Sequence, residues 1–76
     1  MEENNQLIKV HPNPTSSVLF LSELCNIKLT DITGKILMEN QNRNSIDLTN
    51  QPKGIYYILI SEENGKHIQR NKVVKN

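Results

Sequence analysis

The side chains that could serve as nucleophiles, general bases or metal ligands are few in this 76-residue chain and are scattered along it. Its only cysteine is Cys25, and its two histidines are His11, which precedes a proline, and His67. Nucleophilic catalysis needs a Ser, Cys or Thr beside an oriented base, and a zinc site needs about three or four ligands at set spacings. The sequence offers no such grouping. We therefore expect no enzymatic activity, no metal and no cofactor, and we expect Cys25 to be a small apolar residue.

Motifs that bind phosphate, carry glycans or attract nucleic acid are equally hard to find. The three glycines lie too far apart to form a phosphate-binding loop. Asn13-Pro14-Thr15 is not an acceptor for N-glycosylation, because its middle residue is proline. The net charge of +1 provides no field that would gather nucleic acid or an anionic membrane. We therefore expect neither nucleic acid nor a small-molecule substrate as a partner.

Apolar residues recur in short stretches that suit β-strands. The sequence contains no alanine, whereas Ile, Val, Thr and Tyr together account for 19 of its 76 residues, a composition that favours a pleated sheet. None of the stretches has the length or the 3.6-residue spacing of a helix. They are Leu7 to Val10, Val18 to Leu21, Ile27 to Ile32, Ile36 to Met38, Ile46 to Leu48, Ile55 to Ile60, and Ile68 to Val74. Seven strands are predicted.

Turn-forming residues separate these stretches. They are Pro12-Asn13-Pro14, Thr33-Gly34-Lys35, Gln51-Pro52-Lys53-Gly54, which suits a type I turn, and Asn64-Gly65, a hairpin signal. Apolar and polar residues alternate within several stretches, as at Ile27 and Leu29, which places one face of each strand on a core. The pattern predicts an all-β sandwich of two sheets. We expect residues 1–5 to be a residual linker or disordered start and residues 6–76 to form the domain.

The stretch Ile55 to Ile60 breaks this alternation, because it has six apolar residues in a row. Such a run predicts a central strand that is partly covered on both faces. An exposed second face on this strand would invite a partner.

Five motifs stand in a characteristic order. They are His11-Pro12-Asn13-Pro14-Thr15-Ser16, Leu29-Thr30-Asp31-Ile32-Thr33-Gly34-Lys35, Ile46-Asp47-Leu48, Lys53-Gly54-Ile55-Tyr56-Tyr57-Ile58, and Lys72-Val73-Val74-Lys75. This series, over roughly residues 8 to 75, closely resembles the C-terminal sorting domain of the type IX (Por) secretion system. The resemblance implies a small seven-stranded immunoglobulin-like β-sandwich attached in cis to an upstream cargo domain. His11 departs from the pattern, because the family usually has Tyr or Phe there.

The resemblance further implies that the domain is a sorting signal for its cargo. The cargo would pass through the periplasm, the tail would engage the type IX secretion translocon and its outer-membrane shuttle barrel, and a surface sortase would usually cleave the tail. The cargo would then be at the cell surface or secreted. The recognition residues carried over from the family are Pro12, Asn13, Pro14, Gly34, Lys35, Gly54, Tyr56, Lys72, Val73, Val74 and Lys75.

Each of these residues also has a purely structural interpretation. The two glycines suit turns, Tyr56 suits a core, and the two prolines suit a rigid corner. The closing strand, Lys72 to Lys75, is then the better candidate for direct contact with the translocon, which could add a strand along an exposed edge.

Two alternatives remain open at this point. An exposed edge would also permit a weak homodimer. The domain could instead be an accessory immunoglobulin-like module that binds carbohydrate or a neighbouring domain. Phe20, Tyr56 and Tyr57 are the only aromatic residues of the Phe, Tyr and Trp types in the chain, which disfavours a sugar platform.

Overall fold

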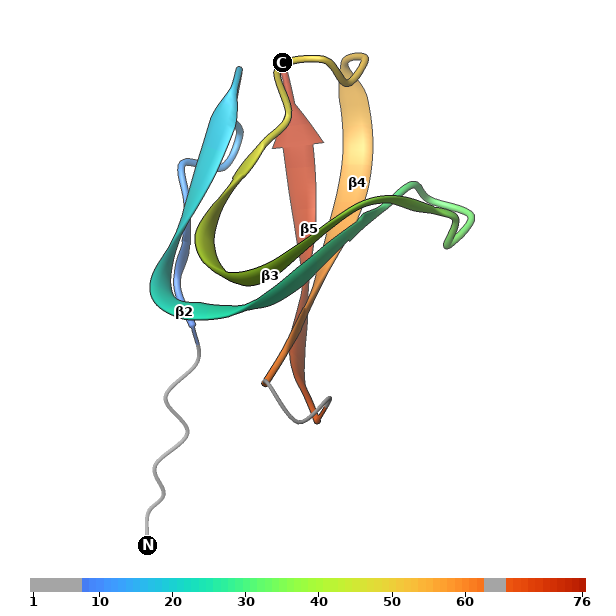
Figure 1. The fold of residues 1–76 in the computed structure, drawn as a ribbon. Coiled ribbons are helices and arrows are strands. Elements are labelled where there is room, and N and C mark those ends of the chain that lie inside the picture. Colours follow the sequence, from blue (N-terminus) through green and yellow to red (C-terminus); the bar gives the residue numbers. More distant parts are fainter. Residues whose placement is uncertain (1–7, 63–65) are drawn as a thin grey trace, which may run out of the picture.

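The computed structural model describes residues 8–62 and 66–76, and these residues form one curled, half-barrel sheet of antiparallel strands (Figure 1). The strands are β1 (Val10–His11), β2 (Val18–Thr30), β3 (Ile36–Asp47), β4 (Gly54–Ser61) and β5 (His67–Lys75). The all-β prediction is confirmed. The predicted linker at residues 1–5 and the predicted turn at Asn64-Gly65 lie outside the described residues.

Within the described ranges this architecture has five strands in one sheet, and it does not show the predicted division into seven strands in two sheets. The stretches Val18 to Leu21 and Ile27 to Ile32 belong largely to one strand, β2, and β3 likewise joins the next two. The polar residues between them contain neither Pro nor Gly, so the chain stays extended there. It bends through shifts of register between Phe20 and Cys25 and between Cys25 and Ile27, as bulged strands do.

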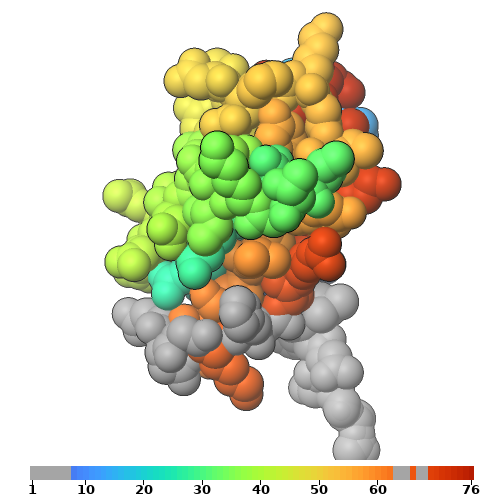
Figure 2. All heavy atoms as spheres, turned by 90° about the vertical axis from the view of Figure 1, so that its right-hand side faces the viewer, coloured from blue at the N-terminus to red at the C-terminus, as the bar shows by residue number. Residues whose placement is uncertain are grey.

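The long strand β2 holds the sheet together because its two halves have different neighbours. Near its start, Leu21 pairs with Val10 of β1, and near its end, residues 26–30 pair with β4. Strand β3 follows β2 along the opposite edge. Strand β4 lies between β2 and β5, which confirms the predicted central strand. Figure 2 shows the β2–β3 connection (green) on the same face of the molecule as β4 (orange) and β5 (red).

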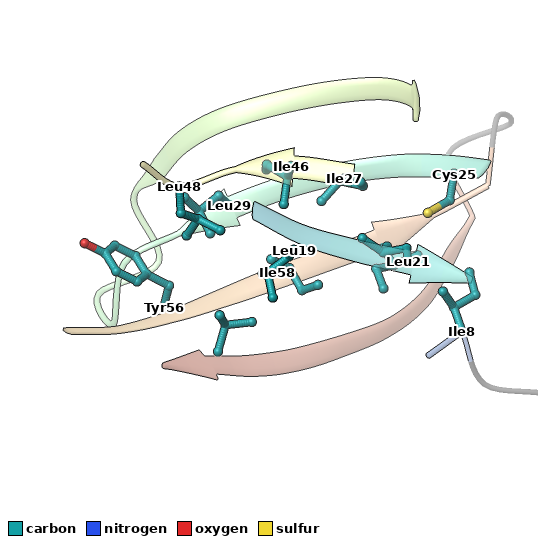
Figure 3. Close-up of a cluster of buried hydrophobic side chains, with 12 residues drawn as sticks. Ile8, Leu19, Leu21, Cys25, Ile27, Leu29, Ile46, Leu48, Tyr56 and Ile58 are labelled. Atoms are coloured by element: carbon teal, nitrogen blue, oxygen red, sulfur yellow. The ribbon is translucent and has the colours of Figure 1, made fainter. Parts of the chain in front are cut away.

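The core fills the concave side of the curl (Figure 3). The alternation in β2 and β4 decides which residues enter it, since successive side chains of a strand point to opposite faces. Cys25 is buried among them, and burial, with a smaller effect from the Glu23 carboxylate, raises the pKa of its thiol. The fully buried apolar side chains are Leu19, Ile27, Leu29, Ile46, Leu48, Ile58, Ile60 and Val73.

Candidate recognition surface

The segment after β1 is joined to the last strand by the side chain of Asn13. Its Nδ2 donates a hydrogen bond to the carbonyl oxygen of Lys72 at 2.9 Å, and its Oδ1 accepts one from the N–H of Val74 at 3.1 Å. A side-chain amide carries the same donor and acceptor as a peptide group. Asn13 therefore takes the place of a neighbouring strand at this edge of β5.

Thr15 continues the same attachment through its backbone. Its N–H donates to the carbonyl oxygen of Val74 at 2.9 Å, and its carbonyl oxygen accepts from the N–H of Asn76 at 2.8 Å. The Thr15 side chain is 2% exposed, and its hydroxyl bonds to the Val18 carbonyl oxygen at 3.2 Å. Thr15 is not among the recognition residues predicted from the sequence, although it belongs to the motif His11 to Ser16.

A second side chain, Gln69, holds β5 closer to its start. Its Oε1 accepts a hydrogen bond from the N–H of Ile8 at 2.7 Å, and its Nε2 donates to the carbonyl oxygen of Ile8 at 2.9 Å. The outer edge of β5 is therefore engaged at several points by residues 8–15. A partner that added a strand at the Lys72 to Asn76 edge would have to displace the Asn13 and Thr15 contacts.

The C-terminal end of the domain gathers several of the predicted recognition residues. The Nζ of Lys75 donates to the carbonyl oxygen of Gln51 at 2.8 Å, in the β3–β4 connection. The hydroxyl of the buried Tyr56 donates to the carbonyl oxygen of Pro52 in the same connection. At the top of Figure 1, the C-terminus lies beside this connection. Lys75 and Tyr56 therefore fix the shape of this end.

Gly34 and Gly54 both have a backbone conformation that favours glycine. Gly34 has φ +93° and Gly54 has φ +152°, a region that L side chains rarely adopt. A Cβ at either position would meet no atom within 4 Å, so the requirement for glycine comes from φ and not from crowding. The hydrogen-bonded turn before Gly54 joins Gln51 to Leu48, three residues earlier than the predicted Gln51 to Gly54 turn.

The β2–β3 hairpin, which contains Gly34 and Lys35, is organised by the carboxylate of Asp31. Its Oδ1 accepts hydrogen bonds from the N–H and the hydroxyl of Thr33 at 2.8 and 2.6 Å, and from the N–H of Lys35 at 3.1 Å. This is the side-chain turn that Asp favours. It leaves Ile32 70% exposed at the tip.

The carboxyl of Asp31 predicts an acid-sensitive contribution to stability. The Thr33 hydroxyl, with the N–H groups of Lys35 and Thr33, lowers the pKa of Asp31 below its ordinary value. Because the folded pKa is the lower one, this contribution is present above the unfolded pKa, about 3.9, and is lost as pH falls through the folded pKa. Asp31→Asn should therefore be less stable than the unmodified domain at neutral pH, and urea unfolding should show the difference shrinking in acid. A difference that persists at low pH would contradict a role for the charge.

The predicted recognition residues therefore lie at two places in the fold, and some of them are buried whereas others are exposed. Asn13 meets Lys72 and Val74, and Gly54, Tyr56 and Lys75 lie at the same end, whereas Gly34 and Lys35 belong to the separate hairpin. Val73 and Tyr56 are core residues. The exposed members are Pro12, Asn13, Pro14, Gly34, Lys35 and Lys72.

A cavity of about 200 Å³ is lined by none of these residues. Its described lining contains no histidine and consists of Ile8, Glu23, Leu24, Cys25, Asn26, Asn42 and Glu62. Among the side chains that the structure describes, no three His, Cys, Asp or Glu residues are grouped to hold a metal ion. The same residues include no helix with the length and hydropathy to cross a bilayer.

A family model described as the secretion system C-terminal sorting domain matches residues 9–76. The chain belongs to this family. The sorting domain is a type IX secretion signal for cargo proteins, and its family is non-catalytic. The cargo of such a domain is exported, either to the cell surface or into the medium. A search of curated proteins found no match to this chain.

Proposed function

We propose that this sorting domain carries an upstream cargo, joined to it in cis, from the periplasm across the outer membrane by binding the type IX translocon, the outer-membrane shuttle barrel and the sortase. The sortase then removes the tail at the cell surface. The observation that carries the proposal is the family match over residues 9–76, which takes in all five strands. The secretion machinery is the kind of partner that such a domain implies.

The attachment of residues 8–15 to β5 supports recognition of a folded shape. Asn13, Thr15 and Gln69 hold the last strand in one position. A signal that is already ordered loses little conformational entropy when it binds. We propose that the buried family residues Tyr56 and Val73, and the two glycines, act by shaping this end, whereas Pro12, Pro14, Lys35 and Lys72 supply the contacts.

The bends in the two long strands bear on the predicted sandwich fold. Bends in β2 and β3 let each strand serve both sides of the curled sheet. We propose that these bends correspond to the division between the two sheets of the seven-stranded immunoglobulin-like sandwich, each long strand counting as two.

A reporter fusion tests the function directly. Residues 1–76 are placed behind a signal peptide and a fluorescent protein in a host that has a type IX system, and in the same host with its translocon inactivated. Reporter at the surface or in the medium is expected only in the first host, whereas the reporter without the tail should remain in the periplasm. Retention of the tailed reporter in the periplasm of both hosts would contradict the proposal and favour the accessory carbohydrate-binding or domain-binding module.

A further inference from the structure

The outer face of the sheet, which is turned away from the core, carries apolar side chains where a solvated antiparallel sheet usually carries polar ones. Along β4, Tyr56, Ile58 and Ile60 are buried, so the residues that alternate with them point outward. Those outward residues are Ile55, Tyr57 and Leu59. Ile55 is 43% exposed, and the other two are half-buried. The central strand therefore presents an apolar row on its outer side.

Cations flank this row on both neighbouring strands. On β5, Lys72 lies directly opposite Tyr57, and Arg70 lies directly opposite Leu59. On β2, Lys28 lies opposite Leu59 from the other side. Directly opposite residues of paired strands share a face, so these cations and the apolar row form one surface. We call this surface the cationic outer face, made of Lys28, Ile55, Tyr57, Leu59, Arg70 and Lys72.

Two contacts within or beside this face set its charge and geometry. The guanidinium carbon of Arg70 lies 4.1 Å from the centroid of the Tyr57 ring, the arrangement of a cation–π pair. At the β3 side, the Nζ of Lys28 lies 3.9 Å from a carboxylate oxygen of Glu39. The three cations of this face and the carboxylate of Glu39 together carry a net charge of +2, whereas the whole chain carries a net charge of +1. The positive charge is therefore concentrated here.

We propose that the cationic outer face binds a protein component of the type IX machinery that presents an apolar strip flanked by carboxylates. This inference rests on the proposed function. Tyr and Arg are the residue types enriched at protein interfaces and at their energetic centres. The row of Ile55, Tyr57 and Leu59 would be buried against the strip, and Arg70 and Lys72 would pair with the carboxylates. Such complementarity selects a partner and raises the association rate.

The charge on this face favours a protein over a lipid surface. Segments that bind anionic lipid can be recognised in a sequence by clusters of roughly four to eight Lys and Arg residues. The face has three cations, and Glu39 partly offsets one of them. An interface in which a few charges border an apolar centre needs no larger cluster.

The test reverses charge on this face in the reporter fusion of residues 1–76. Arg70→Glu with Lys72→Glu is compared with a matched pair, Lys9→Glu with Arg43→Glu, which makes the same change in net charge at two exposed residues outside the face. The urea unfolding of each purified domain shows that it folds. If the first pair does not fold, Arg70→Gln with Lys72→Gln replaces it, with export compared in the same way.

Export of the folded Arg70 and Lys72 variant is expected to fall at least about tenfold relative to the unmodified tail, because like charges would then face each other at the interface. The Lys9 and Arg43 variant should be exported normally. Normal export of the first variant would overturn this inference and leave the proposed function intact, since the unmodified tail is still exported. An equal fall in both variants would also overturn it. Failure of the unmodified tail would instead refute the proposed function.

Two binding measurements address other occupants of the face. The purified domain is floated with vesicles that contain phosphatidylglycerol, and its molar mass is measured by analytical ultracentrifugation. The domain should neither bind the vesicles nor self-associate through this face. Vesicle binding or dimerisation that Arg70→Glu with Lys72→Glu abolishes would overturn the assignment to a protein of the secretion machinery.

Discussion

Replacement of Ile58 by alanine is expected to remove a large share of the domain's free energy of unfolding and to reduce export of the fused reporter. Ile58 is fully buried and projects from the central strand β4 into the core. Truncation of a buried Ile to Ala costs about 2–5 kcal/mol, whereas a domain of this length is stable by about 4–11 kcal/mol. Urea unfolding of the purified domain measures the first effect, and the reporter fusion measures the second.

Ile55→Ala on the same strand is the matched control for stability. Ile55 points to the outer face and is 43% exposed, so its truncation should cost less than about 1 kcal/mol. An equal loss of stability in the two variants would contradict the burial pattern of β4. Normal export of an unfolded Ile58→Ala tail would mean that the secretion machinery reads an extended sequence and not the folded domain.

Replacement of Asn13 by alanine is expected to release the last strand from residues 12–15. It removes the two hydrogen bonds to Lys72 and Val74, each worth about 0.5–1.5 kcal/mol, so the free energy of unfolding should fall by about 1–3 kcal/mol. Hydrogen exchange should become faster at the Val74 amide, which loses its acceptor. The exposed residue Asn44 lies in β3, outside the β5 attachment, and Asn44→Ala should leave both measurements unchanged.

Asn13→Asp gives this interpretation a sharper test, because it keeps the acceptor and loses the donor. At neutral pH a carboxylate oxygen would face the Lys72 carbonyl oxygen, where Asn13 now donates a hydrogen bond. A protonated carboxyl has an O–H donor. The Asp variant should therefore recover stability relative to the Ala variant as pH falls through the pKa of the new carboxyl. A pH-independent difference between the two variants would contradict the donor role assigned to Asn13.

The candidate site could be predicted only in part, because its contacts join residues that are distant in sequence. The family pattern selected Asn13 and the closing strand, but the bonds between them span 59 and 61 residues. No local pattern indicates which backbone groups a side-chain amide will meet at that separation. Gln69 was missed for the same reason, since its partner Ile8 lies 61 residues away. The Gly34 turn, by contrast, is local and was visible in the sequence, whereas Gly54 begins β4 and the hydrogen-bonded turn before it lies three residues earlier than predicted.

The sequence by itself determined the all-β class, the family, the inward residues such as Ile27 and Ile58, the glycine positions and the central place of β4. These properties follow from side-chain alternation, from φ preferences and from motif order, all of which are local or linear. Only the tertiary structure decided that seven stretches form five strands, because bulges with no Pro or Gly marker bend β2 without ending it. It also decided that Arg70 and Lys72 flank the outward row of β4, since cross-strand register depends on how the whole sheet pairs.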